Sequence, residues 1–391
     1  MGYQLGIDVG SATTVVAAVV DGGWPAVLTI GGGRGLPSVL YMPSEGGVVY
    51  GRAAQRRALT DPSRAAQGFL RRLGEPGHLL VGGAAYTPDG LLARLVSHVV
   101  SQVVQARGEA PEQIVVAHPT FWSERRRELF AAAVGQSAGV SAPVSVCSSA
   151  EAVGTLLARR SAVRTVDLVG YYDFGADFFD SAVLSFSPFG FQQVGAGSGL
   201  DNAGGADFDE LLLDRVLAEA GTSRTALPPA ALARLREECT QAKEVLSEDD
   251  SVDLQVAAAG VSATVTLTRA DLETLVTPIV EDTVRAFRHA LSSASASPQD
   301  ISSVLLYGGT ARMPLVGRML RAELPGVRRW ESGSDEDVAL GAALLAAQLA
   351  EQASPGRDDV TAVIRPPDTT PPVLSTPPVV SGGGFPKVPG T

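Results

Sequence analysis

Residues 7–14 read Ile7-Asp8-Val9-Gly10-Ser11-Ala12-Thr13-Thr14, a short polar turn between two apolar runs. The apolar runs cover residues 5–9 and 15–20. This pattern predicts a strand, a tight turn and a second strand. Gly10 permits close approach of the backbone to a ligand, and Ser11 adds a hydroxyl beside the amides of the turn. A turn of this composition can hold a phosphate group.

Asp8 places one carboxylate at the rim of this turn, and carboxylate oxygens suit a hydrated magnesium ion. The turn is a weak signal by itself, because many strand turns carry Asp and Gly without binding a ligand. An ordinary hairpin therefore stays an open alternative for this segment taken alone.

A second turn of the same kind occurs near the middle of the chain. Val166 and Leu168 precede it, and residues 171–180 repeat the pattern Asp-x-Gly at Asp173 and Gly175. Two such hairpins, each opening about half of the chain, predict a duplicated domain with a cleft between its halves. With this repeat, the sequence resembles the actin-like ATPase superfamily, and within it the nucleotide-binding domain of DnaK-type (Hsp70) heat-shock chaperones.

Further segments carry the same resemblance. Residues 199–209 resemble the family segment Leu-Gly-Gly-x-Asp-Phe-Asp, and residues 304–314 resemble its adenosine loop, Gly-Gly-x-x-Arg-x-Pro. Lys243 and Ser247 match two positions of an adenosine-binding helix face, and residues 334–343 resemble the closing helix of the family. The resemblance thus extends over about residues 4 to 350.

The resemblance implies an α/β fold of two lobes, a duplicated ribonuclease-H-like arrangement with a central nucleotide cleft. Lobe I would comprise residues 1–165 and 335–350, and lobe II would comprise residues 166–334. The implied cofactors are ATP or ADP and Mg²⁺, and the implied partner is adenine nucleotide. Residues 351–391 are rich in Pro and Gly and are expected to form a disordered tail. A protein partner could bind this tail or the lobes.

The resemblance also implies three groups of site residues. The catalytic positions are Asp8, Arg71, Glu151 and Asp173, of which Asp8 and Asp173 would hold the metal through water. The phosphate-binding positions are Gly10, Ser11, Ala12, Gly175, Gly204 and Gly205. The adenosine-binding positions are Lys243, Ser247, Gly308, Gly309 and Arg312.

Two catalytic positions depart from the family pattern. The family has a lysine where this chain has Arg71, and that lysine contacts the transferred phosphate. Arginine keeps the charge but not the compact ammonium, so this exchange is not neutral. The family glutamate that orders metal-bound water falls here on Ser148 or Ser149, and Glu151 is the nearby carboxylate. Glu151 either substitutes for that glutamate or is an ordinary surface residue of the following helix.

The second phosphate turn also departs from the family pattern. Ala176-Asp177-Phe178 stands where the family has Gly-Gly-Thr. If Asp177 pointed at the terminal phosphate, like charges ~4 Å apart at an effective dielectric near 20 would repel by roughly 4 kcal/mol. Either Asp177 faces away from the phosphate, or the turn no longer embraces a terminal phosphate. The altered residues predict at most weak ATPase activity.

A strand over residues 114–118 is expected to end at Pro119, and a helix is expected to begin near its cap, Ser123. In the family, the positions of Pro119 and Arg127 relay nucleotide state between domains. On the residues alone, an ordinary strand-to-helix turn is an equally good interpretation.

Composition limits the classes of partner. The chain has 31 basic and 42 acidic residues, a net charge of −11 spread along the sequence, which argues against nucleic acid and anionic membranes. Cys147 and Cys239 have no zinc or disulfide spacing, and the four histidines share no metal-ligand spacing. No secretory signal is apparent, and the apolar run at residues 338–347 is too short to span a bilayer. We therefore predict a cytoplasmic protein.

Three functions remain open. The first is a DnaK-like switch or chaperone-like regulator that binds ATP and hydrolyses it slowly. The second is a pseudo-ATPase, an interaction module that binds nucleotide without turnover. The third is a sugar or acid kinase of the same fold, which the absence of an inserted substrate domain or cysteine cluster disfavours. The sequence after the resembling segments is not expected to form a substrate-binding β-domain.

Overall fold

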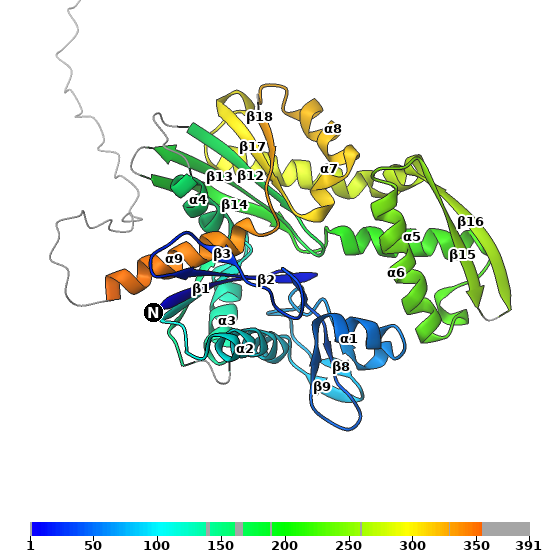
Figure 1. The fold of residues 1–391 in the computed structure, drawn as a ribbon. Coiled ribbons are helices and arrows are strands. Elements are labelled where there is room, and N and C mark those ends of the chain that lie inside the picture. The colour runs from blue at the N-terminus through cyan, green and yellow to red at the C-terminus, as the bar shows by residue number, and fades with distance from the viewer. Residues whose placement is uncertain are drawn as a thin grey trace, which may run out of the picture. The chain divides into compact units, whose positions relative to one another are not determined.

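The computed structural model describes residues 2–137, 141–160, 167–187, 190–258, 260–327 and 329–353 (Figure 1). Met1–Ala353 form one compact unit. The expected tail lies outside the described residues from residue 354 onward, whereas residues 351–353 complete helix α9 (Asp337–Ala353). The helix continues past residue 350 because Glu, Gln and Ala are good helix formers, and the first breaker is Pro355.

The first half of the chain builds a sheet, called here the N-terminal sheet, with strand order β11-β10-β1-β2-β3 and with β4 also paired to β2. Its strands are β1 (Tyr3–Val9), β2 (Thr13–Val20), β3 (Ala26–Val27), β4 (Leu36–Pro37), β10 (Gln113–His118) and β11 (Val144–Ser148). The first predicted hairpin is confirmed, because β1 and β2 pair antiparallel, with Val9 opposite Thr14 beside the turn. Strands β10 and β11 continue the sheet in parallel from β1.

The second half builds the C-terminal sheet, with strand order β14-β13-β12-β17-β18. Its strands are β12 (Asp167–Phe174), β13 (Phe179–Ser187), β14 (Gly190–Leu200), β17 (Ile301–Tyr307) and β18 (Arg329–Ser332). Here β12 is antiparallel to β13 and parallel to β17, as β1 is to β2 and β10. The repeated order and directions confirm the predicted fold class, a mixed α/β fold with a duplicated sheet.

Two helices lie between the sheets. Helices α4 (Ser149–Arg160) and α9 pack against each other, α4 against β13 and β14, and α9 against β1, β2 and β10. Side chains alternate along β1, so that Leu5 and Ile7 join the core cluster of α2 while Gly6 faces α9. Small residues let α4 and α9 approach each other closely, because a Cβ at Gly341 would overlap the backbone of Ala152.

The remaining elements cover the outer faces and extend the two halves (Figure 1). In the first half they are α1 (Gly51–Ala58), α2 (Pro88–Arg107), α3 (Glu124–Gly135), the short strands β5 (Leu40–Tyr41), β6 (Val49–Tyr50) and β7 (Ala65–Ala66), and the hairpin β8 (Leu79–Val81) with β9 (Ala84–Tyr86). In the second half they are α5 (Gly205–Glu219), α6 (Pro229–Val245), α7 (Arg269–Ser293), α8 (Pro314–Glu323), and the hairpin β15 (Ser251–Ala258) with β16 (Val261–Thr268).

The predicted start of α3 is confirmed, since the Ser123 side chain accepts a hydrogen bond from the Arg126 backbone N–H. Within the described ranges, no helix has an apolar stretch of the length that spanning a bilayer would require.

Candidate functional site

A cavity of about 1150 Å³ lies where the two halves of the chain face each other. The β1–β2 turn and the loop before Leu70 line it from the first half. The β12–β13 turn, the start of α5, helix α6 and the 3₁₀ turn Gly309–Arg312 line it from the second half. All predicted site residues line this cavity except Glu151 and Gly204.

Ser38 fixes the conformation of the β1–β2 turn through hydrogen bonds. Ser38 donates its hydroxyl to the carbonyl of Gly10 at 2.6 Å, and its backbone N–H to the carbonyl of Ala12 at 2.9 Å. The Ser38 hydroxyl also lies 2.9 Å from Thr14 Oγ1 inside the fold. Two carbonyls of the turn are thereby fixed toward the protein, which leaves the Ser11 side chain at the cavity wall.

The β12–β13 turn is tied to the start of α5. Gly205 N–H donates to the Gly175 carbonyl at 3.0 Å, and Ala206 N–H donates to the Ala176 carbonyl at 2.8 Å. Thr310 Oγ1 donates to the Gly175 carbonyl as well, at 2.8 Å. The first backbone N–H groups of α5, at the predicted phosphate-binding residue Gly205 and at Ala206, therefore hydrogen-bond to this turn. Gly204 is a packing glycine, because a Cβ there would overlap the Ala176 carbonyl.

Asp8 and Asp173, the predicted metal-binding pair, are both buried carboxyl groups that line the cavity. Burial raises the pKa of Asp8 to about 7, and the charges of Asp173 and Asp335 add to this. Burial likewise raises the pKa of Asp173 to about 6, against the hydrogen bond it accepts from Tyr171 Oη at 2.9 Å. Such carboxylates gain from a nearby cation. Among the described residues, no three or more His, Cys, Asp or Glu side chains are arranged to ligate a metal directly.

The predicted adenosine residues line the cavity from the end of α6 and from the 3₁₀ turn after β17. Lys243 Nζ lies 2.7 Å from Asp209 Oδ1 and donates to the Gly205 carbonyl at 2.8 Å, so its charge reaches the start of α5. Gly308 has a φ of +80°, and a Cβ there would overlap the Phe174 carbonyl and lie 2.7 Å from Asp173 Oδ1. This explains why a glycine follows β17.

The cavity wall is strongly acidic. Of the described residues, eleven carboxylates and four cations line the cavity. Each of these cations has a carboxylate partner: Arg71 with Asp207, Arg236 with Glu210, Lys243 with Asp209, and Arg312 with Asp335. A phosphorylated ligand must therefore bring a counter-ion or displace these partners.

Glu151 does not enter the cavity lining. It lies in the first turn of α4, and its carboxylate accepts a 3.4 Å hydrogen bond from the Ser148 backbone N–H, which caps its own helix. Ser149 occupies the cavity wall instead, with its hydroxyl donated to the His118 carbonyl at 3.1 Å. The expectation that Glu151 substitutes for the family glutamate thus has no support from its position.

Arg71 and Asp177 contact each other across the cavity wall. Arg71 Nη2 lies 3.4 Å from Asp177 Oδ1 and 3.2 Å from the Asp177 carbonyl, and Arg71 forms two further hydrogen bonds with Asp207. Burial raises the pKa of Asp177, and the charge of Arg71 and the Ser11 hydroxyl counteract this. Asp177 thus faces the cavity. This position fits the second of the two alternatives, in which the turn no longer embraces a terminal phosphate. Sequence reasoning missed Asp207, although it lies in the quoted Gly-Gly-x-Asp-Phe-Asp segment.

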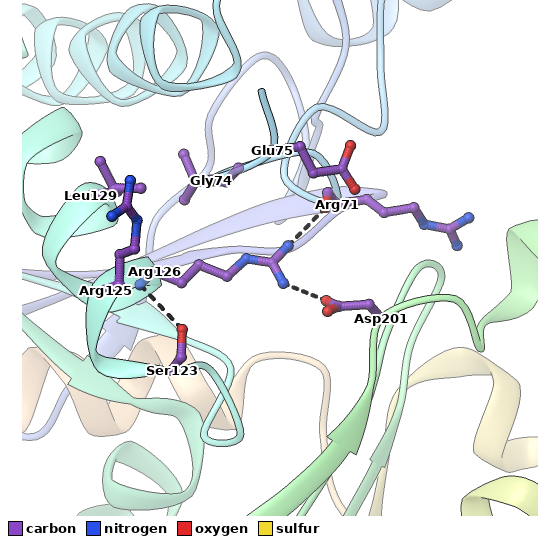
Figure 2. A pocket seen from close by; sticks show the side chains of 9 residues that line it. Arg71, Gly74, Glu75, Ser123, Arg125, Arg126, Leu129 and Asp201 are labelled. Carbon is purple, nitrogen blue, oxygen red and sulfur yellow. Dashed lines mark hydrogen bonds and ion pairs between the residues drawn. The ribbon is translucent and has the colours of Figure 1, made fainter. Parts of the chain in front are cut away.

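A smaller pocket of about 200 Å³ lies beside Arg71, and Figure 2 shows Arg126 crossing it. Arg126 pairs with Asp201 and donates to the carbonyls of Leu70 at 3.1 Å and Arg71 at 2.8 Å. Its guanidinium lies over Trp122, 4.4 Å from the ring centroid. Arg127, which the family pattern indicated for a relay between domains, is exposed, and the contacts to the other half come from Arg126.

Comparison with known proteins adds two findings. A family model described as Hsp70 protein matches residues 76–363. Chaperone protein DnaK of Thermotoga petrophila is 28% identical over 384 residues, which cover 93% of this chain and 62% of that protein. Chaperone protein DnaK of Thermotoga sp. (strain RQ2) matches with the same identity and coverage. The chain therefore spans about 62% of the length of these curated relatives.

Proposed function

Because this chain belongs to the Hsp70 family, we propose that it binds ATP and ADP with Mg²⁺ in the large cavity. We further propose that it acts as a chaperone-like or regulatory switch that hydrolyses ATP slowly or not at all. The chain spans about 62% of its curated relatives, so client binding and partner proteins belong to the proposal as well. A cytoplasmic location stays a prediction.

One observation carries the proposal of nucleotide binding. Both Asp-x-Gly turns, Lys243 and the segment Gly308–Arg312 line one cavity, although they come from distant parts of the sequence. The turns provide backbone and hydroxyl groups of the kind that bind phosphate, and the glycines at Gly308 and Gly309 leave room for a flat base. A volume of about 1150 Å³ accommodates a nucleotide.

Slow hydrolysis is supported by the groups around the expected terminal phosphate. The guanidinium of Arg71 is engaged by Asp207 and Asp177. Glu151 caps its own helix and is not part of the cavity lining. Loss of one preorganised donor typically costs about 2.7–4 kcal/mol of transition-state stabilisation, so several altered groups together predict very slow turnover. A bound magnesium ion, held through water by Asp8 and Asp173, would supply charge neutralisation to the phosphates.

Calorimetry with ADP and with ATP, each with magnesium, tests the binding proposal. Gly309→Leu is the diagnostic variant, because a Cβ at Gly309 meets nothing within 4 Å and its side chain would enter the cavity. We expect this variant to fold and to lose nucleotide affinity. Gly135→Leu is the matched control, since a Cβ at Gly135 also meets none of the described residues within 4 Å, and Gly135 lies at the end of α3, away from the cavity lining. No binding to the unmodified chain would refute the proposal.

A steady-state phosphate-release assay separates the switch from the second candidate, a pseudo-ATPase that binds nucleotide without turnover. The paired state of Arg71 is the observation that favours this second candidate. Measurable release that Asp8→Asn abolishes would support the slow switch, and binding without release would support the pseudo-ATPase. Turnover as fast as in ordinary DnaK-type domains would contradict both.

A further inference from the structure

Arg71 joins the two halves of the chain through a forked ion pair. It lies in the loop after β7, whereas Asp207 lies in the first turn of α5. Arg71 Nη1 lies 2.9 Å from Asp207 Oδ1, and Nη2 lies 2.8 Å from Asp207 Oδ2. Nη2 also reaches the carbonyl and carboxylate of Asp177. A planar guanidinium and a planar carboxylate in this geometry form the strongest type of protein ion pair.

The pair is shielded from water more than a surface ion pair. The exposed fraction of the side chain is 23% for Arg71, 22% for Asp207 and 8% for Asp177. Solvent therefore weakens these interactions less than it weakens an exposed pair, whose contribution is typically about 0–1 kcal/mol.

The same groups lie where the two phosphate-type turns meet. Ser11 comes from the β1–β2 turn and Asp177 from the β12–β13 turn, and both line the cavity together with Arg71 and Asp207. Arg71 Nε is buried and has no hydrogen-bond partner among the described residues, whereas the Ser11 hydroxyl interacts with the Asp177 carboxylate and counteracts the rise in its pKa that burial causes. A polar ligand atom would give Arg71 Nε a partner.

A third phosphate beside these two turns would meet an unfavourable charge balance. Arg71 is the cationic side chain beside these two turns, and it already forms ion pairs with Asp177 and Asp207. The other lining cations, Lys243, Arg236 and Arg312, pair with carboxylates of their own. A terminal phosphate must either take Arg71 from Asp207 or lie beside two carboxylates, with no unpaired cationic side chain among the described residues that line the cavity.

We propose that Asp207 is a specificity-determining residue, which holds Arg71 away from the ligand and so makes the cavity prefer a nucleoside diphosphate over the triphosphate. This inference rests on the proposed nucleotide binding. The diphosphate ends before Arg71 and leaves the fork intact. The triphosphate binds only at the expense of the fork between Arg71 and Asp207.

The test is the ratio of the affinities for a non-hydrolysable ATP analogue and for ADP, measured by calorimetry with magnesium. Asp207→Asn keeps the shape of the side chain but frees Arg71, and we expect the ratio to rise roughly ten- to hundredfold in favour of the triphosphate. Adding Arg71→Met to Asp207→Asn should cancel this rise, because the freed cation is then absent. Asp177→Asn, which removes a negative charge from the same place, should also raise the ratio.

Asp201→Asn is the matched control. It breaks the Arg126–Asp201 pair, which likewise joins the two halves of the chain but lines only the smaller pocket. The ratio should be unchanged in this variant. An unchanged ratio in Asp207→Asn, with normal ADP binding, would overturn the role of Asp207 and leave the proposed function standing. Absence of binding by the unmodified chain would overturn both. Should Asp207→Asn fail to fold, Asp207→Ser, which removes the same carboxylate, takes its place in the test.

Discussion

Phe178 forms aromatic contacts between the two halves of the chain. The family pattern has a threonine at this position, whereas here the Phe178 ring packs on Trp122 with centroids 6.0 Å apart and on Phe121 at 6.2 Å. The guanidinium of Arg126 lies 5.5 Å from the same ring. The position has therefore become part of the contact between the two halves of the chain.

We predict that Phe178→Thr lowers the free energy of unfolding by about 1–3 kcal/mol, because a partly buried ring loses its aromatic and cationic neighbours. Chemical denaturation measures this change in the free energy of unfolding. Trp24→Thr is the control, since the Trp24 side chain is 52% exposed. Phe191→Thr is unsuitable as a control, because the Phe191 ring packs against Gly154. Equal stability of Phe178→Thr and the unmodified chain would show that this aromatic contact contributes nothing.

Asp180 is a second residue with a role that the sequence did not indicate. Its carboxylate accepts the backbone N–H groups of Thr120 at 2.6 Å and Phe121 at 3.0 Å, which links β13 to the loop after β10. Burial raises the pKa of Asp180 to about 7, and the hydrogen bond from Thr120 N–H opposes this. An acid with a raised pKa keeps its proton longer in the folded state than in the unfolded state.

The free energy of unfolding should therefore fall as pH rises from about 4 to about 7, by at most about 1.4 kcal/mol per pH unit from this group. We predict a flatter pH dependence over that range in Asp180→Asn, measured by urea denaturation without nucleotide or metal. Asp300→Asn is the control: the Ser297 hydrogen bond lowers the pKa of Asp300, so this group does not titrate there. Identical slopes in the unmodified chain and in Asp180→Asn would contradict the prediction.

Helices α4 and α9 pack against each other, and each also packs against a sheet. Their contact therefore connects the two sheets. A Cβ at Gly341 would overlap the carbonyl of Ala152, so the two helix backbones touch without a side chain between them. Close packing of this kind leaves no room for an added methyl group.

Gly341→Ala should therefore reduce the free energy of unfolding by about 1–3 kcal/mol, although Gly-to-Ala exchange in a free helix is stabilising by roughly 0.5–1 kcal/mol. Gly135→Ala in α3 is the matched control, because its Cβ would meet nothing within 4 Å, and we expect it to be neutral or slightly stabilising. Thermal and chemical unfolding of both variants measure the difference. The same sign for both substitutions would show that the helices can separate at no cost.

The acidic wall of the large cavity predicts that nucleotide binds only with a divalent cation. Eleven carboxylates against four paired cations, among the described residues, repel free polyphosphate. We predict that a chelator weakens ADP affinity by more than about tenfold, since one uncompensated charge at ~4 Å is worth roughly 4 kcal/mol at an effective dielectric of 20. Calorimetry with and without magnesium measures this, and chelator without nucleotide is the control. Equal affinities would place the phosphates away from the carboxylates.

The compact unit Met1–Ala353 contains all predicted site residues. We predict that ending the chain at Ala353 leaves both the melting temperature and the ADP affinity unchanged, because the Pro- and Gly-rich sequence beyond it cannot build a core. Differential scanning calorimetry of the shortened and full chains checks this. A lower melting temperature or a weaker affinity after truncation would show that the tail contacts the compact unit.

Local patterns in the sequence were sufficient for the duplicated fold. Each hairpin is encoded within about 20 residues, by two apolar runs and an Asp-x-Gly turn, and both form as predicted in β1–β2 and β12–β13. The cap at Ser123 and the glycine after β17 are likewise local, because a helix end and a positive φ depend on neighbouring residues. The family motifs named residues from distant segments, and all of them except Glu151 and Gly204 line one cavity.

Pairings between distant charges were decided only by the tertiary structure. Arg71 and Asp207 are 136 residues apart, and no local pattern links them, yet the two halves bring them into one fork. The same is true of Asp180 with Thr120, and of Arg126 with Asp201. Ion pairs and hydrogen bonds depend on distances of a few ångströms between side chains, and those distances are set by how the sheets pack across α4 and α9.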